Sequence, residues 1–219
     1  MAQMYEILTR EQLAPDIYRI RIHAPRIAQK RRPGQFVVLR TAETGERIPL
    51  TIAGADREAL SITVVYQVVG PTTEHLAELG PGDEIPDVVG PLGQPTELGE
   101  YDHAVCLGGG LGIALILPLA RALSPTTGRL TGIISARSAD RLILARELET
   151  VCDDLKIATD DGSRGHHGFP TEVLENMLEA GTPIDAVYAV GPVPLMAGGA
   201  DGTRPHGIKT VPSRNHIML

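Results

Sequence analysis

The sequence contains only two cysteines, Cys106 and Cys152, and they do not form a Cys-x-x-Cys pair. Two thiols cannot supply the four ligands of a [2Fe–2S] cluster or a structural zinc ion, so this chain alone is not expected to ligate either one. Scarce, unpaired cysteines are typical of a reduced, cytoplasmic protein. Cys106 falls in an apolar stretch and is predicted to be a small core residue.

Long apolar runs and clustered positive charge are also lacking. No uninterrupted apolar run reaches transmembrane length, and residues 1–10 lack the basic-then-apolar layout of a signal peptide. The net charge is −7, with no basic cluster beyond residues 30–32, which argues against a nucleic-acid binder. A length of 219 residues with 42% hydrophobic content suits two globular domains of about 100 residues each.

Residues 1–99 have the pattern of an antiparallel β-structure. Short runs of alternating or β-branched residues are separated by turn residues such as Pro33-Gly34 and Pro81-Gly82. Strands are predicted at 18–23, 35–40, 50–53, 60–69 and 84–89, with a short helix at 73–79. Several short strands at this spacing predict a small antiparallel β-barrel.

Residues 100–219 change to an alternation of strands and helices. Strands are predicted near 103–107, 130–136, 155–159, 185–190 and 207–211. Helices are predicted near 112–123, 139–151 and 170–180, followed by an irregular helix, because residues 197–202 contain three glycines. This alternation predicts an α/β domain, in which helices cover both faces of a parallel sheet.

The glycine run Gly108–Gly112 lies between a predicted strand and a predicted helix. Glycines allow the backbone to approach a phosphate closely, and a helix N-terminus offers unpaired N–H groups. The alternative is that the glycines only pack the helix on the strand. Three more loops, at 135–138, 159–163 and 191–194, also follow predicted strands. Because ligands of such sheets bind at the carboxyl ends of the strands, the four loops predict a nucleotide site.

Taken in order, six segments resemble the ferredoxin–NADP reductase superfamily. Within it, the likeness is to the FAD-binding subunits of ferredoxin:NADP oxidoreductases, sulfide dehydrogenases and dihydroorotate dehydrogenases. The matching segments are 46–52, 65–73, 90–96, 108–112, 158–163 and 191–196. The resemblance implies FAD on the barrel, residues 1–99, and a nicotinamide nucleotide, NAD(P)(H), on residues 100–219. It also implies that electrons pass through FAD between NAD(P)H and a partner carrier or subunit.

The resemblance also implies which residues bind the cofactors. For FAD these are Arg47, Pro49, Leu50, Thr51, Tyr66, Gln67, Val68, Gly70, Thr72 and Thr73. For the nucleotide these are Gly108, Gly109, Gly110, Gly112, Ile113, Arg137, Ser138, Asp161, Gly162, Gly191, Pro192 and Met196. No catalytic acid or nucleophile is expected, because the cofactors carry the chemistry.

For some of these residues the expected role can be stated more closely, and for others two roles stay open. Thr51 is expected to end a strand with its hydroxyl near the flavin, and Thr72 or Thr73 to cap the following helix. Tyr66 either contacts FAD or is an ordinary barrel residue. Asp161 either binds a ribose hydroxyl or shapes an Asp-Gly turn.

The sequence departs from the superfamily pattern in two places. The usual flavin motif is Arg-x-Tyr-Ser, but Arg47 stands four residues before Thr51 and leucine replaces tyrosine, so Arg47 is either a pyrophosphate ligand or a surface arginine. The family also continues into a cysteine-rich [2Fe–2S] segment, whereas this sequence stops at 217–219. It is therefore expected to be either a fragment or a form without the cluster.

Two other functions stay open alongside an electron-transfer subunit. One is a non-catalytic flavin- or nucleotide-binding module, and the other is a stand-alone flavin reductase. Reduction of bound flavin by NADH or NADPH distinguishes the enzyme from the binding module. For the enzyme subunit, the resemblance implies a partner with iron–sulfur or flavin centres.

Overall fold

The computed structural model describes residues 4–212 and divides the chain into two compact units, one up to Thr96 and one from Glu97 onward. The segment 217–219, on which the expectation of a missing cluster segment rests, lies outside the described residues. Within residues 4–212, no helix is long and apolar enough to cross a membrane.

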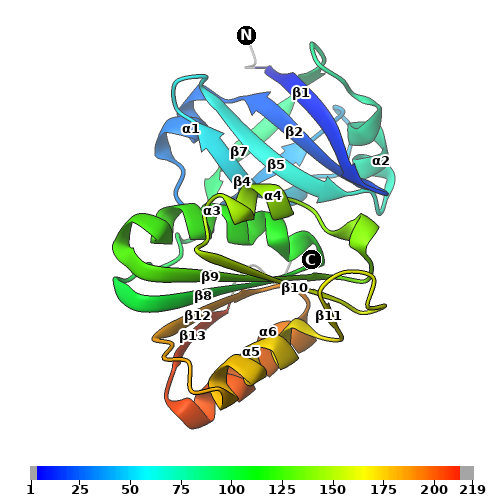
Figure 1. Cartoon of the computed structure of the whole chain (residues 1–219). Coiled ribbons are helices and arrows are strands. Elements are labelled where there is room, and N and C mark those ends of the chain that lie inside the picture. The colour runs from blue at the N-terminus through cyan, green and yellow to red at the C-terminus, as the bar shows by residue number, and fades with distance from the viewer. Residues whose placement is uncertain (1–3, 213–219) are drawn as a thin grey trace. The chain divides into compact units, whose positions relative to one another are not determined.

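The first unit is a seven-stranded antiparallel sheet that nearly closes into a barrel, as the sequence predicts (Figure 1). The strand order is β6-β1-β2-β5-β4-β3-β7. The strands are β1 (Tyr5–Ala14), β2 (Ile17–His23), β3 (Phe36–Arg40), β4 (Ile48–Asp56), β5 (Ser61–Gln67), β6 (Glu84–Ile85) and β7 (Asp87–Leu92). Two helices accompany them, α1 (Pro25–Lys30) and α2 (Pro71–Glu78).

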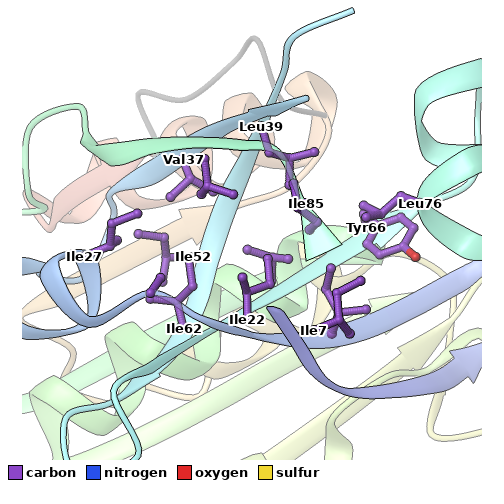
Figure 2. Close-up of a cluster of buried hydrophobic side chains, with 14 of the residues drawn as sticks. Ile7, Ile22, Ile27, Val37, Leu39, Ile52, Ile62, Tyr66, Leu76 and Ile85 are labelled. Atoms are coloured by element: carbon purple, nitrogen blue, oxygen red, sulfur yellow. The ribbon is translucent and has the colours of Figure 1, made fainter. Parts of the chain in front are cut away.

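Alternate residues of the paired strands form the barrel core. Ile20 and Ile22 of β2 lie opposite Val64 and Ile62 of β5, and all four are fully buried. Leu76 of α2 is also fully buried and packs into this cluster, near Tyr66 (Figure 2). Each such side chain contributes about 1.5–3 kcal/mol by leaving water, which is why α2 stays packed on the barrel.

The second unit is a six-stranded, fully parallel sheet with the order β11-β10-β9-β8-β12-β13. Its strands are β8 (Tyr101–Gly109), β9 (Thr127–Ala136), β10 (Asp154–Thr159), β11 (His166–His167), β12 (Ala186–Val190) and β13 (Lys209–Pro212). Helices α3 (Ile113–Leu123) and α4 (Ala145–Glu149) lie on one face, and α5 (Pro170–Glu179) and α6 (Val193–Thr203) lie on the other (Figure 1). This α/β arrangement confirms the predicted fold class.

Three elements are not predicted from the sequence, the ten-residue strand β1 and the short elements α1 and β11. Two predicted elements are divided. The strand predicted at 84–89 is two strands, β6 and β7, which pair with β1 and β3 respectively. Pro86 between them has no N–H for a continuous ladder. The helix predicted at 139–151 breaks at Leu144, whose φ of +56° is left-handed, so only a 3-10 turn, η3 (Ala139–Arg141), and α4 remain.

The prediction of an irregular last helix is wrong, because α6 runs unbroken through its glycines. These glycines make room for tight packing. A Cβ at Gly199 would lie 3.2 Å from Leu107 Cδ2, and one at Gly198 would lie 3.0 Å from Thr171 Cγ2 of α5. Close contact with α5 and the sheet therefore offsets the poor helix propensity of glycine.

Two substitutions in α6 test this explanation. Gly199→Val should lower the free energy of unfolding by about 2 kcal/mol, because its methyl groups overpack against Leu107. Gly202→Ala should raise it by about 1 kcal/mol, because a Cβ there meets Glu175 Cγ at an ordinary 3.7 Å and helix propensity improves. Urea denaturation measures both. If both substitutions stabilise the protein, the packing explanation is wrong.

Candidate functional site

The four loops predicted to converge do meet at the carboxyl edge of the parallel sheet. They surround a cavity of about 470 Å³. Its lining comes from the ends of β8, β9, β10 and β12 and from the first turns of α5 and α6. The lining residues are Gly109, Gly110, Ser135, Ala136, Arg137, Asp160, Phe169, Pro170, Thr171, Pro192, Pro194 and Leu195.

Only four of the predicted nucleotide residues line this cavity: Gly109, Gly110, Arg137 and Pro192. Met196 of α6 is buried in the core of this unit, so its expected contact with the nucleotide stays a prediction. Ile113 is fully buried at the start of α3, where it anchors the helix.

The glycine run divides into one open position and two packing positions. Gly110 has a left-handed φ of +57°, and a Cβ there would meet no atom within 4 Å. A Cβ at Gly112 would lie 2.5 Å from the carbonyl oxygen of Val190, and one at Gly108 would lie 2.8 Å from Ile116 Cγ1. The packing interpretation therefore holds for Gly108 and Gly112, while Gly110 leaves space that a phosphate can fill.

Two turns of the backbone nearly touch below the cavity. A Cβ on Gly191 would lie 3.3 Å from the backbone nitrogen of Gly109, and one on Gly109 would lie 2.5 Å from Leu195 Cδ1. Gly109 and Gly191 therefore bring the ends of β8 and β12 together, and Leu195 covers the point of contact. These glycines shape the floor of the cavity.

Asp161 forms the Asp-Gly turn after β10. Its carboxylate accepts hydrogen bonds from the backbone N–H of Ser163 (2.9 Å) and from its hydroxyl (2.6 Å), and these bonds lower the pKa of Asp161 below its usual range. Gly162 completes the turn with a φ of +72°. Ser163 Oγ also accepts a hydrogen bond from the backbone N–H of Ala139 at 2.8 Å. The turn-forming role is therefore the one that the contacts support, and it joins the loops after β9 and β10.

Arg137 and Ser138 follow β9 and differ in their contacts. Arg137 is exposed, lines the cavity, and has no carboxylate partner among residues 4–212. Ser138 donates its hydroxyl to the Asp140 carboxylate. Arg137 is thus a cation directed at the cavity that is free to meet an anionic ligand.

Sequence reasoning missed the apolar rim of the cavity. Phe169 is 62% exposed at the N-terminus of α5 and lines the cavity beside Pro170 and Pro194. An exposed aromatic side chain at the mouth of a cavity offers a flat apolar surface to a ligand ring. The sequence signal was Gly168-Phe169-Pro170, an aromatic residue immediately before a helix start.

On the barrel, Gly70 precedes α2 in a second open turn. A Cβ there would meet no atom within 4 Å. The expected threonine N-cap is wrong, because Gly70 is the N-cap and Pro71 starts the helix. Instead, Thr73 Oγ1 accepts hydrogen bonds from the N–H groups of Val69 (2.9 Å) and Gly70 (3.1 Å). The N–H groups of Thr72 and Thr73 are therefore the helix-start donors left to face a ligand.

The predicted flavin residues of β4 are only partly where the sequence placed them. Arg47 forms a 2.7 Å ion pair with Asp87 of β7, so the surface interpretation describes it. Thr51 does not end a strand; it lies buried inside β4, opposite Phe36. Pro49 and Leu50 are half-buried on the same strand, and Gln67 and Val68 are half-buried at the end of β5.

Tyr66 is a core residue whose hydroxyl lacks a partner. Its side chain is fully buried, and its ring stacks on Tyr18 with centroids 5.9 Å apart. Burial raises the pKa of the Tyr66 phenol well above its ordinary value. Among the described residues nothing hydrogen-bonds its hydroxyl. The ring therefore belongs to the barrel core, as the alternative interpretation holds, and the hydroxyl is buried there without a hydrogen-bond partner.

Both cysteines are buried, and neither forms a disulfide bond. Burial raises the pKa of the Cys152 thiol to about 11 and raises that of Cys106 further. Both side chains are therefore neutral thiols near pH 7. The part of the chain that the structure describes contains no group of three or more His, Cys, Asp or Glu side chains arranged to hold a metal ion.

No family model matches the chain. Comparison with known proteins does find relatives of similar sequence. The chain is 39% identical, over 98% of its length, to a Thermotoga maritima protein named dihydroorotate dehydrogenase B (NAD(+)), electron transfer subunit homolog, and spans 75% of that protein. It is 32% identical over 84% of its length to the dihydroorotate dehydrogenase B (NAD(+)), electron transfer subunit of Fusobacterium nucleatum, and spans 73% of it.

Solved structures show the same similarity. A chain of an NADH-dependent reduced ferredoxin-NADP oxidoreductase, studied for flavin-based electron bifurcation, superposes with a TM-score of 0.90 at 37% identity, over 100% of this chain and 79% of that one. A Neisseria gonorrhoeae ferredoxin NADP⁺ reductase with bound FAD and NADP shares the fold, with a TM-score of 0.75 at 16% identity over 96% of this chain and 98% of that one.

The unpartnered hydroxyl of Tyr66 leads to a stability prediction. In the protein without added cofactor, Tyr66→Phe should raise the free energy of unfolding by about 1 kcal/mol, because it removes a buried polar group without breaking a hydrogen bond. Tyr188→Phe is the matched control. The Tyr188 hydroxyl contacts that of Tyr101 (3.2 Å) and the carbonyl of Glu97 (3.1 Å), so its loss should destabilise by about 1 kcal/mol. Equal losses in urea denaturation would mean that the Tyr66 hydroxyl has a partner.

Proposed function

The chain belongs to the family of dihydroorotate dehydrogenase B electron-transfer subunits, and from this premise we propose that it is the FAD- and NAD(P)H-binding subunit of a larger oxidoreductase. Residues 1–99 bind FAD, and residues 100–219 bind the nicotinamide nucleotide. The observation that carries the proposal is a pair of glycine turns, Gly70 and Gly110, one in each unit. Each turn leads into a helix start and is open where a side chain would stand.

The nucleotide fits the cavity at the sheet edge. The turn at Gly110 leads through η1 (Gly110–Gly112) into α3, so its N–H groups face the space that a pyrophosphate needs. Arg137 supplies a positive charge at the same cavity, and Phe169 supplies an apolar surface for a ring. A volume of about 470 Å³ is in the range of small-molecule and cofactor sites.

FAD fits the open turn before α2. The N–H groups of Thr72 and Thr73 and the start of the helix are suited to hold its pyrophosphate, and Gly70 leaves room for that group to approach. Pro49, Leu50 and Thr51 of β4, with Gln67 and Val68 at the end of β5, are the residues that the resemblance assigns to the rest of FAD. Arg47 would have to leave Asp87 to reach a phosphate, so the proposal does not rely on it.

The chemistry needs binding and orientation from this chain rather than acid–base catalysis. Bound FAD supplies a ring that takes a hydride from a nicotinamide and gives up electrons one at a time. The chain's residues hold the two cofactors and exclude water from them. Single electrons need an acceptor, and the relatives are named electron transfer subunits, so the chain works with a partner subunit. Iron–sulfur or flavin centres in that partner, and a cytoplasmic location, stay predictions.

A pair of matched variants tests the proposal, because the two glycine turns lie in different units. Gly110→Val should weaken binding of NADH and NADPH by at least about tenfold while FAD stays bound, because its side chain fills the phosphate space. Gly70→Val should do the reverse, weakening FAD by a similar factor and sparing the nucleotide. Calorimetric titration measures each affinity, and far-UV circular dichroism checks folding. A folded variant that loses both cofactors equally, or neither, would overturn the proposal.

A further inference from the structure

The outer edge of the parallel sheet is only half covered. Strand β11 pairs with β10 only through Ala158 and Thr159. The first four residues of β10, Asp154–Ile157, pair with β9 on one side. On their other side the described residues place no strand, but the loop before β11 covers the end of this stretch, because a Cβ at Gly165 would lie 2.1 Å from the carbonyl oxygen of Ile157. Backbone N–H and C=O groups on an open edge are ready to pair with an added strand.

A groove of about 570 Å³ runs beside this open edge. It is lined by Asp154, Lys156 and Ile157 of β10, by Arg129 of β9, and by residues in and after α5, namely Val173, Asn176, Met177, Ala180 and Thr182. His166 of β11 also lines it. The groove shares no lining residue with the nucleotide cavity, so it is a separate feature of this unit.

The groove carries more positive than negative charge. Arg129 and Lys156 both approach the carboxylate of Asp154, at 3.9 and 3.0 Å, so one of the two cations is uncompensated. Both side chains keep contact with solvent, at 55% and 35% exposure. The chain as a whole has a net charge of −7. The negative charge of the chain as a whole repels an acidic partner. The excess positive charge in the groove attracts it to this edge.

We propose that an extended, acidic segment of a partner subunit adds to β10 as a strand, in line with β11. Backbone hydrogen bonds to the N–H and carbonyl groups of Leu155 and to the N–H of Ile157, which face away from β9, supply affinity, and Arg129 and Lys156 select acidic side chains. Four residues of strand span about 13 Å. The inference rests on the proposed function only in assigning the segment to a partner subunit. The competing explanation is that Lys156 merely guards an open edge against aggregation, which predicts that no acidic strand binds.

The experiment uses three synthetic peptides of about six residues, long enough to span the open edge. One alternates glutamate with valine, one alternates lysine with valine, and one is the acidic peptide with proline in place of valine. Hydrogen–deuterium exchange is followed on the FAD-loaded full chain. The acidic peptide alone should slow exchange of the Leu155 and Ile157 amides by at least about fivefold, because these amides face the open side and only this peptide has both the charge and the N–H groups needed.

A charge variant assigns the selectivity to the groove. Arg129→Gln combined with Lys156→Gln should weaken binding of the acidic peptide by about tenfold. Arg204→Gln combined with Lys209→Gln removes the same charge from exposed positions outside the groove and should leave binding unchanged. Protection by all three peptides, protection by none, or equal weakening by both variants would overturn the proposal. Flavin reduction by NADH, measured on the same samples, reports separately on the proposed function.

Discussion

The close approach of two backbone turns at the carboxyl edge of the parallel sheet is the constraint on which the cavity at that edge depends. The turn after β8 and the end of β12 come together because Gly109, Gly112 and Gly191 carry no side chains. A Cβ at Gly112 would lie 2.5 Å from the carbonyl oxygen of Val190. This contact fixes the start of α3 against β12, and Gly110 then turns outward with a left-handed φ. Because Gly109, Gly112 and Gly191 pack closely, Gly110 is left open to a ligand.

The barrel reaches a comparable result by different means. Its helix start is held by Thr73, whose hydroxyl accepts from the N–H groups of Val69 and Gly70 and donates to the Gly70 carbonyl. Leu76 ties the same helix to the barrel core. In both units, buried side chains hold a helix in place, and the glycine turn that leads into the helix is open. Two open glycine turns, one in each unit, agree with the proposal that the chain binds two nucleotide cofactors.

Local patterns in the sequence predicted most of the fold. Alternation in 18–23 and the β-branched run in 60–69 identified the paired strands β2 and β5, and the strand–glycine–helix order located the nucleotide cavity. The errors arose where distant contacts decide the outcome. The glycines of α6 are tolerated because Leu107 and Thr171 pack against them. The two alternatives for Arg47 stayed open because its partner, Asp87, lies forty residues away. Phe169 was missed because its exposure beside the cavity depends on the tertiary fold.

Reduction of FAD-loaded protein by NADH or NADPH under anaerobic conditions tests the central claim most directly. The visible flavin absorbance should bleach when the nucleotide is added to the wild-type chain, and it should stay unchanged in Gly110→Val, which keeps FAD but not the nucleotide. Full absorbance in a wild-type chain that has bound both FAD and the nucleotide would contradict the account, because the two sites would then not serve one electron-transfer path.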